Sequence, residues 1–530
     1  MNNVIVSPHY LSTEIGSTIF NKGGNAVDAA ILTNLIQGIV APETCGIGGD
    51  LFALIWVPGK NKPEFLDASG YSGSNVDQDL LSNYENIPLN HPLSVTVPGA
   101  VAGWRELNNK YGNIPIEDIL DIGINLCHEG FRVSEELFNS LNIHSEELSG
   151  QKSGYSFYRD NQPFSIDTLI RRPQLGKTLE LLKEHGLEYF YNGKIAKEIT
   201  NSVNGFLTEE DLANYKAIWR EPLHQKIYGY DGWTSPPSTQ GYLTLSALKG
   251  FEIINNKDDY LHTLIESYRI FASDRDNITY DYLGNDQKFL GTDDQYIKDK
   301  VSLFDKNASG KYNSPNPHGG GTAYMNAVDE NGLGVSLIQS NFYGIGSRIG
   351  VGSYGFFLHN RGCGFNLIQG HPNSLGPNKK PLHTLSPTIW SKDGSLDFIT
   401  GTRGGRYQPQ LLAQTILPYI LGESSFEEIM EKPRWTIEYF GSNTSSNIKF
   451  EFLNEPEISR LKEKGHEISV ENKLIGGYGP ISTIYKNSDK NFIGVPDIRV
   501  GTEKAFNNSS FLSNALYLEF SFSCHNLFYL

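Results

Sequence analysis

A run of three glycines leads directly into a threonine at the start of a strand-like segment. The stretch reads His318-Gly319-Gly320-Gly321-Thr322-Ala323-Tyr324-Met325-Asn326-Ala327-Val328-Asp329. Glycine allows backbone conformations in which the Thr322 hydroxyl could attack the carbonyl carbon of Gly321. A cut between Gly321 and Thr322 would give Thr322 a free α-amine, which titrates near pH ~8 and can act as a general base. Nucleophile and base would then belong to one residue. The alternative interpretation is a Gly-rich loop that enters an ordinary strand.

Two later segments could complete a catalytic site. Gly401-Thr402-Arg403-Gly404-Gly405-Arg406 follows a strand-like run, and backbone N–H groups of adjacent glycines can bind a developing oxyanion. A tight turn between a strand and a helix explains the same residues equally well. The segment Lys380-Pro381-Leu382-His383-Thr384-Leu385-Ser386-Pro387-Thr388 supplies small polar groups that could line a pocket or only cap one.

Other common catalytic patterns are absent from the sequence. It has no phosphate-binding Gly-x-x-x-x-Gly-Lys-Ser/Thr loop, no His-Glu-x-x-His zinc helix and no Gly-x-Ser-x-Gly nucleophile elbow. The four cysteines form no Cys-x-x-Cys pair, and we identify no ligand-spaced pair of a histidine and a carboxylate among the 13 histidines. A metal-dependent amidase is therefore the weakest alternative, and we predict no metal and no cofactor.

Hydrophobic patterning predicts the scaffold that must position these residues. A turn at Gly23-Gly24-Asn25 leads into a helix that stays apolar through Ile36, and the chain from Pro42 to Asp50 ends it before a buried strand at 51–57. Residues 100–270 are expected to be mostly helical, with an amphipathic helix at 173–187. Later strands are expected at 323–328, 334–339, 355–359 and 396–399, and later helices at 410–421 and 455–464. The pattern favours a layered α/β fold with a mostly antiparallel sheet.

Composition limits the classes of partner. The chain has 530 residues, 38% of them hydrophobic, which is ample for a large core, and a formal net charge of -16, which disfavours nucleic acid as a partner. No run reaches the ~18 apolar residues of a membrane span. The N-terminal sequence Met-Asn-Asn-Val-Ile-Val-Ser-Pro has no signal-peptide pattern, so we expect a cytoplasmic protein. Residues 511–530 are strongly aromatic with Glu519 as the one charged residue; they could form a membrane tail, but we favour a peripheral extension.

Several short motifs, in this order and spacing, resemble the γ-glutamyltranspeptidase family of N-terminal-nucleophile hydrolases over roughly residues 5–500. They are Gly23-Gly24-Asn25-Ala26-Val27-Asp28-Ala29-Ala30, Cys45-Gly46-Ile47-Gly48-Gly49-Asp50, Val97-Pro98-Gly99-Ala100-Val101-Ala102-Gly103-Trp104, Pro236-Pro237-Ser238, Ser374-Leu375-Gly376-Pro377-Asn378-Lys379-Lys380-Pro381, Leu385-Ser386-Pro387-Thr388 and Pro496-Asp497-Ile498-Arg499.

The resemblance implies a four-layer αββα fold of the α/β (α+β) class and a precursor that cuts itself. Residues 1–321 would form the large-subunit part and 322–505 the small-subunit part of one domain, with 506–530 as an apolar C-terminal extension. The two parts would stay associated after cleavage.

The resemblance also assigns roles by position. Thr322 is the nucleophile of an acyl-enzyme mechanism, and Gly404 and Gly405 form the oxyanion hole. Ser340 takes the place of a second threonine whose hydroxyl supports the nucleophile. His383 and Thr384 take the places of two serines that hold the substrate carboxylate in glutathione-cleaving members.

Three departures from the family pattern concern the substrate. Ser69 stands where those members use an Arg for the glutamyl α-carboxylate, Cys363 where they use an Asp for the α-amine, and Phe342 where an Asn helps to bind that amine. Loss of a bidentate Arg or of a charged partner removes on the order of 2 kcal/mol of specific binding each.

Two short motifs are more similar to the transpeptidase-like acylase and oxamate-amidohydrolase branch of the family. They are Ser336-Leu337-Ile338-Gln339-Ser340-Asn341 and Asn360-Arg361-Gly362. We therefore predict a self-processing amidohydrolase that cleaves a small amide or γ-glutamyl-type bond. The alternatives are a glutathione hydrolase or γ-glutamyltransferase proper, and a catalytically inactive relative that only binds.

Overall fold

The computed structural model describes residues 2–283, 287–313, 320–438 and 446–508. The aromatic segment 511–530 therefore lies outside the described residues, as do His318 and Gly319. The chain is continuous from Gly321 to Thr322, both of which belong to one strand.

Two antiparallel sheets form the centre of the molecule. The seven-stranded sheet has the order β20 (Lys504–Asn507), β1 (Val4–Ser7), β11 (Gly321–Val328), β12 (Gly334–Phe342), β2 (Asp50–Trp56), β3 (Glu64–Ala68) and β8 (Ile218–Arg220). The six-stranded sheet has the order β19 (Phe492–Val495), β18 (Ile481–Lys486), β14 (Ser395–Thr402), β13 (Thr388–Lys392), β10 (Tyr230–Thr234) and β9 (Leu223–Ile227). Strand β20 includes the first two residues of the range that we expected to be an extension.

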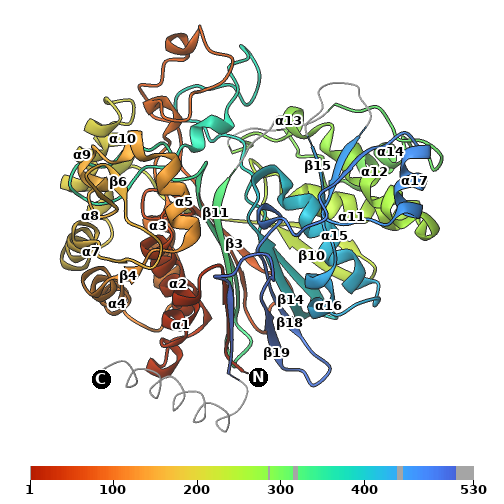
Figure 1. Ribbon diagram of the computed structural model, residues 1–530, viewed down its shortest axis with the longest axis horizontal. Helices are drawn as coiled ribbons and strands as arrows, with labels where there is room; N and C mark the ends of the chain where they lie inside the picture. The colour runs from red at the N-terminus through yellow and green to blue at the C-terminus, as the bar shows by residue number, and fades with distance from the viewer. Residues whose placement is uncertain (1, 284–286, 314–319, 439–445, 509–530) are drawn as a thin grey trace.

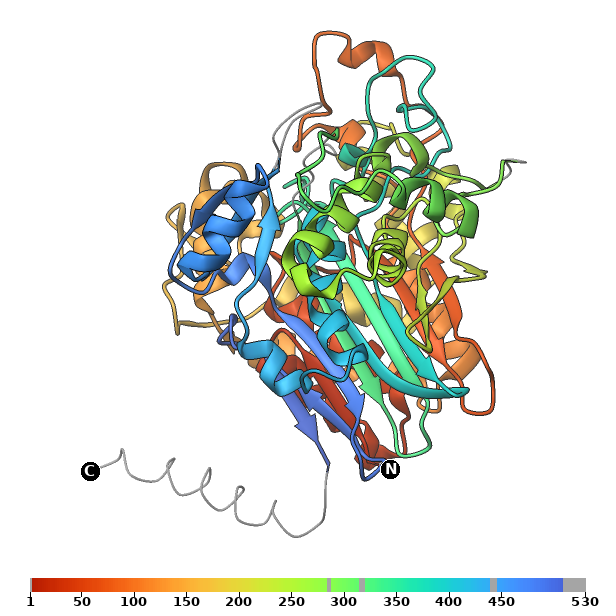
Figure 2. The same ribbon diagram turned by 90° about the vertical axis from the view of Figure 1, so that its right-hand side faces the viewer.

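Helices cover the outer face of each sheet, as Figure 1 shows. On the seven-stranded side lie α1 (Tyr10–Ser17), α2 (Ala26–Val40), α3 (Ala100–Tyr111), α4 (Ile116–Glu129), α5 (Glu135–Ile143), α6 (Ser145–Leu148), α7 (Pro173–His185), α8 (Tyr189–Asn192), α9 (Lys194–Ser202) and α10 (Glu209–Ala213). On the other side lie α11 (Tyr242–Ile254), α12 (Tyr260–Ala272), α13 (Arg275–Ile278), α14 (Asp294–Val301), α15 (Gln408–Ile420), α16 (Phe426–Glu431) and α17 (Glu455–Glu463). Figure 2 looks onto this second group of helices.

Three small sheets complete the fold. They are formed by β4 (Phe131–Arg132) with β7 (Leu169–Ile170), by β5 (Tyr158–Arg159) with β6 (Gln162–Pro163), and by β15 (Trp435–Ile437), β16 (Asn447–Phe450) and β17 (Glu467–Val470). The last of these lies among the helices that cover the six-stranded sheet (Figure 1).

The core between the two sheets explains why they stack. Alternate residues of each strand point to opposite faces, so one face of each sheet supplies apolar side chains to a shared layer. That layer includes Phe52 and Tyr324 from one sheet and Ile389, Ile399 and Ile484 from the other. With the two helical layers, the arrangement is the four-layer αββα sandwich, and the predicted fold class is confirmed.

Helix α2 illustrates how local sequence sets an element. Asn25 and Asp28 form a reciprocal capping box at its N-terminus. Every residue of the helix is buried, because it packs between the seven-stranded sheet and the outer helices. The predicted helix after Gly23-Gly24-Asn25 is therefore confirmed.

Most predicted elements occur, with one clear error. The predicted strand at 51–57 corresponds to β2, and the predicted helices at 173–187, 410–421 and 455–464 correspond to α7, α15 and α17. Residues 355–359 form no strand; Phe357 makes one isolated bridge to Gly350. Gly352 and Gly355 have φ of 44° and 76°, so the chain turns where an extended strand was expected.

Residues 100–270 are mostly helical, as predicted, but they also contain β9 and β10 of the six-stranded sheet. Within the described part of the chain, no helix is both long enough and apolar enough to cross a membrane.

Candidate active site

Thr322 and Ser340 face each other across two neighbouring strands. They are direct partners in the antiparallel pair β11–β12, with a register irregularity between Gly321 and Thr322. Directly opposed residues of an antiparallel pair project from the same face. The Thr322 Oγ1 and Ser340 Oγ atoms lie 3.0 Å apart, and both side chains are buried. The register of the sheet therefore brings together two of the residues that we predicted to be catalytic.

The Ser340 hydroxyl has three partners but only one proton. Its O–H donates to the carbonyl oxygen of Gly321 at 2.7 Å, and the Phe342 N–H donates to its oxygen at 2.8 Å. The Thr322 O–H must then be the donor in its contact with Ser340. This arrangement polarises the Gly321 carbonyl beside the hydroxyl that could attack it.

The glycine turn after β14 lies against the residue that precedes the cleavage position. Gly404 and Gly405 have φ of 121° and 56°, which L side chains rarely adopt. A Cβ placed on Gly320 would lie 3.3 Å from both the Cα and the N atoms of Gly405. The structure therefore brings the predicted oxyanion turn next to the segment that carries the peptide bond between Gly321 and Thr322.

The loop before β18 supports this turn from behind. The Arg403 Nε–H donates to the Gly479 carbonyl at 2.7 Å, and the Thr402 hydroxyl donates to the Pro480 carbonyl at 2.9 Å. Arg403 also forms an ion pair with Glu136 of α5 at 2.6 Å. Arg403 therefore has protein partners on both sides, which favours a structural role for its guanidinium group.

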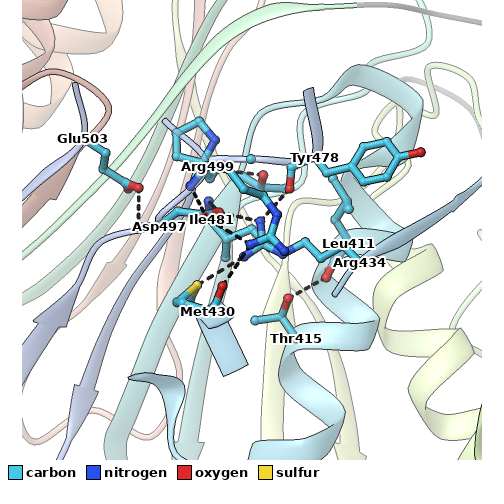
Figure 3. Close-up of polar contacts among 12 residues, drawn as sticks. Leu411, Thr415, Met430, Arg434, Tyr478, Ile481, Asp497, Arg499 and Glu503 are labelled. Carbon is cyan, nitrogen blue, oxygen red and sulfur yellow. Dashed lines mark hydrogen bonds and ion pairs between the residues drawn. The ribbon is translucent and has the colours of Figure 1, made fainter. Parts of the chain in front are cut away.

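Figure 3 shows a buried charged cluster that holds the same loop. Arg434 pairs with Asp497 and donates to the Tyr478 carbonyl at 2.6 Å, while Asp497 accepts from the Ile481 N–H at 2.8 Å. Arg499 pairs with both Asp497 and Glu451. Asp497 and Arg499 of the motif Pro496-Asp497-Ile498-Arg499 thus hold the loop before β18, and this loop contacts the glycine turn.

Asp50 lies next to Ser340 on the neighbouring strand β2, so Thr322, Ser340 and Asp50 are aligned across three adjacent strands. It is the β2 partner of Ser340, and Arg361 donates to its carboxylate through Nε at 2.6 Å. His383 Nε2 lies 3.7 Å from the same carboxylate. All three side chains are fully buried. Burial raises the pKa of Asp50, but the Arg361 guanidinium, with a hydrogen bond from His359, outweighs that effect and holds this pKa below its usual range.

His383 is a neutral ring in this environment. Burial, and then the nearby Arg361, hold its pKa well below the usual value. Its ring contacts Phe52 edge-on, with 4.8 Å between the ring centroids. The neighbouring Thr384 is buried, and its carbonyl accepts from Gln240, whose side chain also donates to the Gly405 carbonyl at 2.9 Å. Gln240 thus links the segment of His383 and Thr384 to the glycine turn.

The three positions that depart from the family pattern have well-defined surroundings. Ser69 donates to Asp67 at 2.6 Å, and Asp67 is also paired with Lys380 at 2.9 Å. The Phe342 ring lies 4.2 Å from the Arg361 guanidinium carbon.

The third of these positions, Cys363, is a neutral thiol. Its Sγ–H contacts the Ile87 carbonyl at 3.4 Å. Burial raises the pKa of this thiol to about 12. It cannot supply the negative charge of the Asp that it replaces.

Sequence reasoning missed the pairing of Asp50 with Arg361. The sequence shows Asp50 at the end of a glycine-rich motif and Arg361 within a branch-specific phrase, and neither pattern names the other residue as its partner. The two residues are separated by 311 positions, so no local pattern links them. Their contact follows from the path of the chain after β12, where the His359 N–H donates to the Gly48 carbonyl beside the start of β2.

The expectation that no histidine and carboxylate have ligand spacing was wrong. His262 and Glu266 lie one turn apart on α12 and form a buried group with His466. The two imidazole rings are hydrogen-bonded at 2.8 Å between His262 Nδ1 and His466 Nε2, and Glu266 is paired with Arg269 at 2.6 Å. These contacts give the group a structural role, because they link α12 to His466, the residue just before β17.

Residues 12–506 match the model of the family described as gamma-glutamyltranspeptidase. The glutathione hydrolase-like YwrD proenzyme of Bacillus subtilis is 30% identical over 497 residues, covering 90% of this chain and 92% of that protein. The oxamate amidohydrolase proenzyme of Klebsiella pneumoniae is 29% identical, covering 94% and 97%. The crystal structure of cephalosporin acylase from Bacillus halodurans superposes with a TM-score of 0.86 at 27% identity, covering 95% of each chain.

Proposed function

The chain belongs to the γ-glutamyltranspeptidase family of self-processing amidohydrolases, and on that premise we propose that Thr322 is its nucleophile. One observation carries the proposal: the Thr322 hydroxyl donates to Ser340, which donates in turn to the carbonyl oxygen of Gly321. This chain of hydrogen bonds places a donor on the carbonyl oxygen that would become negative when the Thr322 hydroxyl attacks.

Self-cleavage would proceed through an ester. The Thr322 Oγ attacks the Gly321 carbonyl carbon, the C–N bond to Thr322 breaks, and the Oγ proton ends on the released amine. Water then hydrolyses the ester between Gly321 and Thr322 Oγ. The products are residues 1–321 with a carboxylate at Gly321 and residues 322–530 with a free α-amine at Thr322, so the second chain contains the small-subunit part 322–505 and the extension 506–530.

Substrate turnover would use the new α-amine as base. The amine accepts the Oγ proton while Oγ attacks the substrate amide carbonyl, and the N–H groups of Gly404 and Gly405 stabilise the oxyanion. The proton passes to the leaving amine, and water hydrolyses the acyl ester. Ser340 keeps its hydrogen bond to Thr322 and holds the nucleophile in place.

The substrate need not be γ-glutamyl. Ser69 and Cys363 are neutral, and Phe342 offers only a ring where relatives bind an α-amine. We therefore favour hydrolysis of a non-glutamyl amide, with the oxamate amidohydrolase among the relatives as a precedent for a small amide. Glutathione hydrolysis or γ-glutamyl transfer remains the second candidate, because curated relatives at 28% identity carry the name glutathione hydrolase.

Mass spectrometry of the purified protein tests the nucleophile. We expect two chains that divide between residues 321 and 322, and an uncut Thr322→Ala variant that runs near 59.1 kDa. A wild-type chain that stays whole would support the inactive binding relative instead. Cell fractionation tests the proposed cytoplasmic location.

A further inference from the structure

Two buried side chains at the Asp50 carboxylate have nitrogen atoms without a hydrogen-bond partner. They are Arg361, through Nη1, and His383, through both ring nitrogens, and both side chains are fully buried. His383 Nε2 lies 3.7 Å from the Asp50 carboxylate, which is too far for a hydrogen bond. Unpaired polar atoms in the interior cost free energy of folding, so native proteins keep them mainly where water, an ion or a ligand completes them. Three such atoms at one place indicate that a polar group binds there.

The Arg361 guanidinium uses only one of its edges for the protein. Its Nε and Nη2 atoms lie 2.6 and 3.3 Å from the two oxygens of Asp50. A guanidinium carries five N–H groups in a rigid plane, so the pairing with Asp50 leaves the N–H groups of Nη1 without an acceptor. Such donors form their strongest hydrogen bonds with a carboxylate or another anion.

Arg361 lies on the acyl side of the reacting bond. Its guanidinium carbon is 4.2 Å from the centre of the Phe342 ring, and Phe342 is the β12 partner of Gly321. Asp50, which holds the guanidinium, is the β2 partner of Ser340. Neighbouring strands lie ~5 Å apart, so about one to two strand spacings separate the guanidinium from Gly321. Gly321 supplies the acyl group in self-cleavage, and the acyl group of a later substrate would take its place.

The backbone of Phe342 is strained at this place. Its φ of 75° is rare for a bulky side chain, and strain of this kind is concentrated at functional sites. The Phe342 N–H donates to the Ser340 hydroxyl at 2.8 Å, and its ring lies against the Arg361 guanidinium. Phe342 therefore connects the support of the nucleophile to Arg361.

The charges around His383 cancel. The ring is influenced by the pair of Asp50 with Arg361 and by the pair of Asp67 with Lys380, whose charged atoms are 2.9 Å apart. Two cations and two carboxylates leave no surplus negative charge to repel an anion. The neutral ring can donate one N–H. Because Arg361 and His383 both lie at the Asp50 carboxylate, one small anionic group can reach both.

We propose that Arg361 and His383 bind the carboxylate of the acyl group, and that the substrates are monoamides of short dicarboxylic acids such as succinic and glutaric acid. The inference rests on the proposed acyl-enzyme function of Thr322, and the place becomes accessible when self-cleavage releases the Gly321 carboxylate. The acyl carbon passes from the amide nitrogen to Thr322 Oγ and then to water. One monoamide and one water give one dicarboxylic acid and one amine.

The position of Arg361 sets two further limits on the acyl group. The carboxylate stands two or three methylene groups from the reacting carbonyl, because it must cover about one strand spacing of ~5 Å. The carboxylate of oxamate, which is attached directly to the reacting carbonyl, is too short. An α-amine is not required, since Cys363 is a neutral thiol and the Phe342 ring already lies against a cation.

A panel of p-nitroanilides with one leaving group isolates the acyl side. The glutaryl and pentanoyl compounds have acyl chains of equal length and differ in the terminal carboxylate. We expect kcat/KM for the glutaryl compound to exceed that for the pentanoyl compound by on the order of 100-fold, and that for the oxalyl and γ-glutamyl compounds by about 10-fold or more. Equal or higher kcat/KM for any of these three compounds would overturn the proposal.

A variant of Arg361 gives a second test. Arg361→Lys keeps a cation beside Asp50 but replaces the two-edged fork with a single ammonium group. We expect the ratio of glutaryl to pentanoyl kcat/KM to fall about 10-fold or more, while kcat/KM for the pentanoyl compound changes by less than about 2-fold. An unchanged ratio would contradict the role of Arg361. If this variant does not fold, the panel on the wild type still decides.

The matched control for this variant is Arg220→Lys. Arg220 also pairs with a buried carboxylate, that of Asp67, at 3.0 Å, and it is not among the side chains with an unpaired nitrogen. Arg220→Lys should therefore keep the wild-type ratio.

The two proposals fail in different ways. If the wild type cuts itself and hydrolyses amides without a preference for the terminal carboxylate, the inference on Arg361 is wrong and the nucleophile stands. If the wild type stays uncut, or Thr322→Ala still hydrolyses the panel, the proposed function itself is wrong.

Discussion

Self-cleavage depends most directly on the hydroxyl group of Ser340. It is the donor to the Gly321 carbonyl, at 2.7 Å, and removal of one oxyanion donor typically slows a reaction by about 10²–10³-fold. We predict that Ser340→Ala slows the appearance of two chains by about that factor, while Ser340→Thr keeps most of the rate. A time course on denaturing gels measures this rate.

Ser336 provides the matched control for that experiment. It lies on the same strand, is equally buried, and bonds the Tyr324 hydroxyl at 2.8 Å. Ser336→Ala should lower stability by about 1 kcal/mol and leave the cleavage rate unchanged. If both variants cleave at the wild-type rate, Ser340 has no part in the reaction.

The α-amine of Thr322 sets the expected pH dependence of the mature enzyme. A protonated amine cannot accept the Oγ proton, so kcat/KM should fall as pH drops below the amine pKa, near ~8 for an ordinary α-amine. A pH–rate profile with one substrate measures this limb. Thr322→Ser should retain it, since the same amine is present; a profile flat from pH ~5 to ~9 would exclude the amine as base.

Residues with local signals were predictable, and those brought together only by tertiary folding were not. The glycines before Thr322 and the pair at 404–405 are visible in the sequence, and the positive φ of Gly404 and Gly405 needs glycine. Asp50 and Arg361 carry no such signal. Asp50 begins β2 and Arg361 begins the turn Arg361–Gly364, so their contact depends on tertiary folding that no local pattern predicts.

At the scale of elements, the buried charged cluster around Asp497 holds the loop before β18, and this loop in turn holds the glycine turn at 404–405. Asp497→Ala would leave Arg434 buried without its carboxylate partner, which typically costs about 3–5 kcal/mol. We predict a lower melting temperature and, because Tyr478 to Pro480 then lose their anchor, a lower kcat with a smaller change in KM. Thermal unfolding and steady-state kinetics measure the two effects.

An exposed ion pair is the control for this variant. Lys449 and Glu471 lie 2.8 Å apart with side chains about a third exposed, so Glu471→Gln should leave the melting temperature nearly unchanged, because solvent screens the pair. An Asp497→Ala enzyme with wild-type kcat would show that the cluster stabilises the fold without positioning the turn.

The elements differed in how well the sequence predicted them. Helices such as α7 and α15 have long apolar patterns, which determine their type with little tertiary help. The apolar residues at 355–359 look like a strand but pack as a turn, because Gly352 and Gly355 take positive φ. A short apolar run does not distinguish a strand from a buried loop.

At the scale of the whole molecule, the two parts of the cut chain are interleaved in one sheet. Strand β11 of the second part pairs with β1 of the first, and β12 pairs with β2. Cleavage breaks one peptide bond and none of these ladders. We predict that the cut protein elutes from a sizing column as one species under native conditions and separates into two chains only in denaturant. Native elution of separate chains would contradict this.

The stability of the whole molecule should fall in mild acid, because two buried histidines resist protonation. Burial, and then His262, lowers the pKa of His466 to about 3, and burial lowers that of His9 to about 4. An unfolded histidine titrates near 6.5, so between those values and 6.5 the unfolded chain binds more protons than the folded one. Stability is therefore full above pH ~6.5 and is lost progressively as pH falls through that window.

Replacement of one histidine tests the cause of the acid sensitivity. His466→Gln keeps a donor and an acceptor for His262 and Ser446 but cannot titrate. We expect its melting temperature to depend less on pH between ~4 and ~6.5 than that of the wild type. His185, whose side chain is 42% exposed, is the control position, and His185→Gln should keep the wild-type slope. A wild-type slope in His466→Gln would assign the acid sensitivity to other groups.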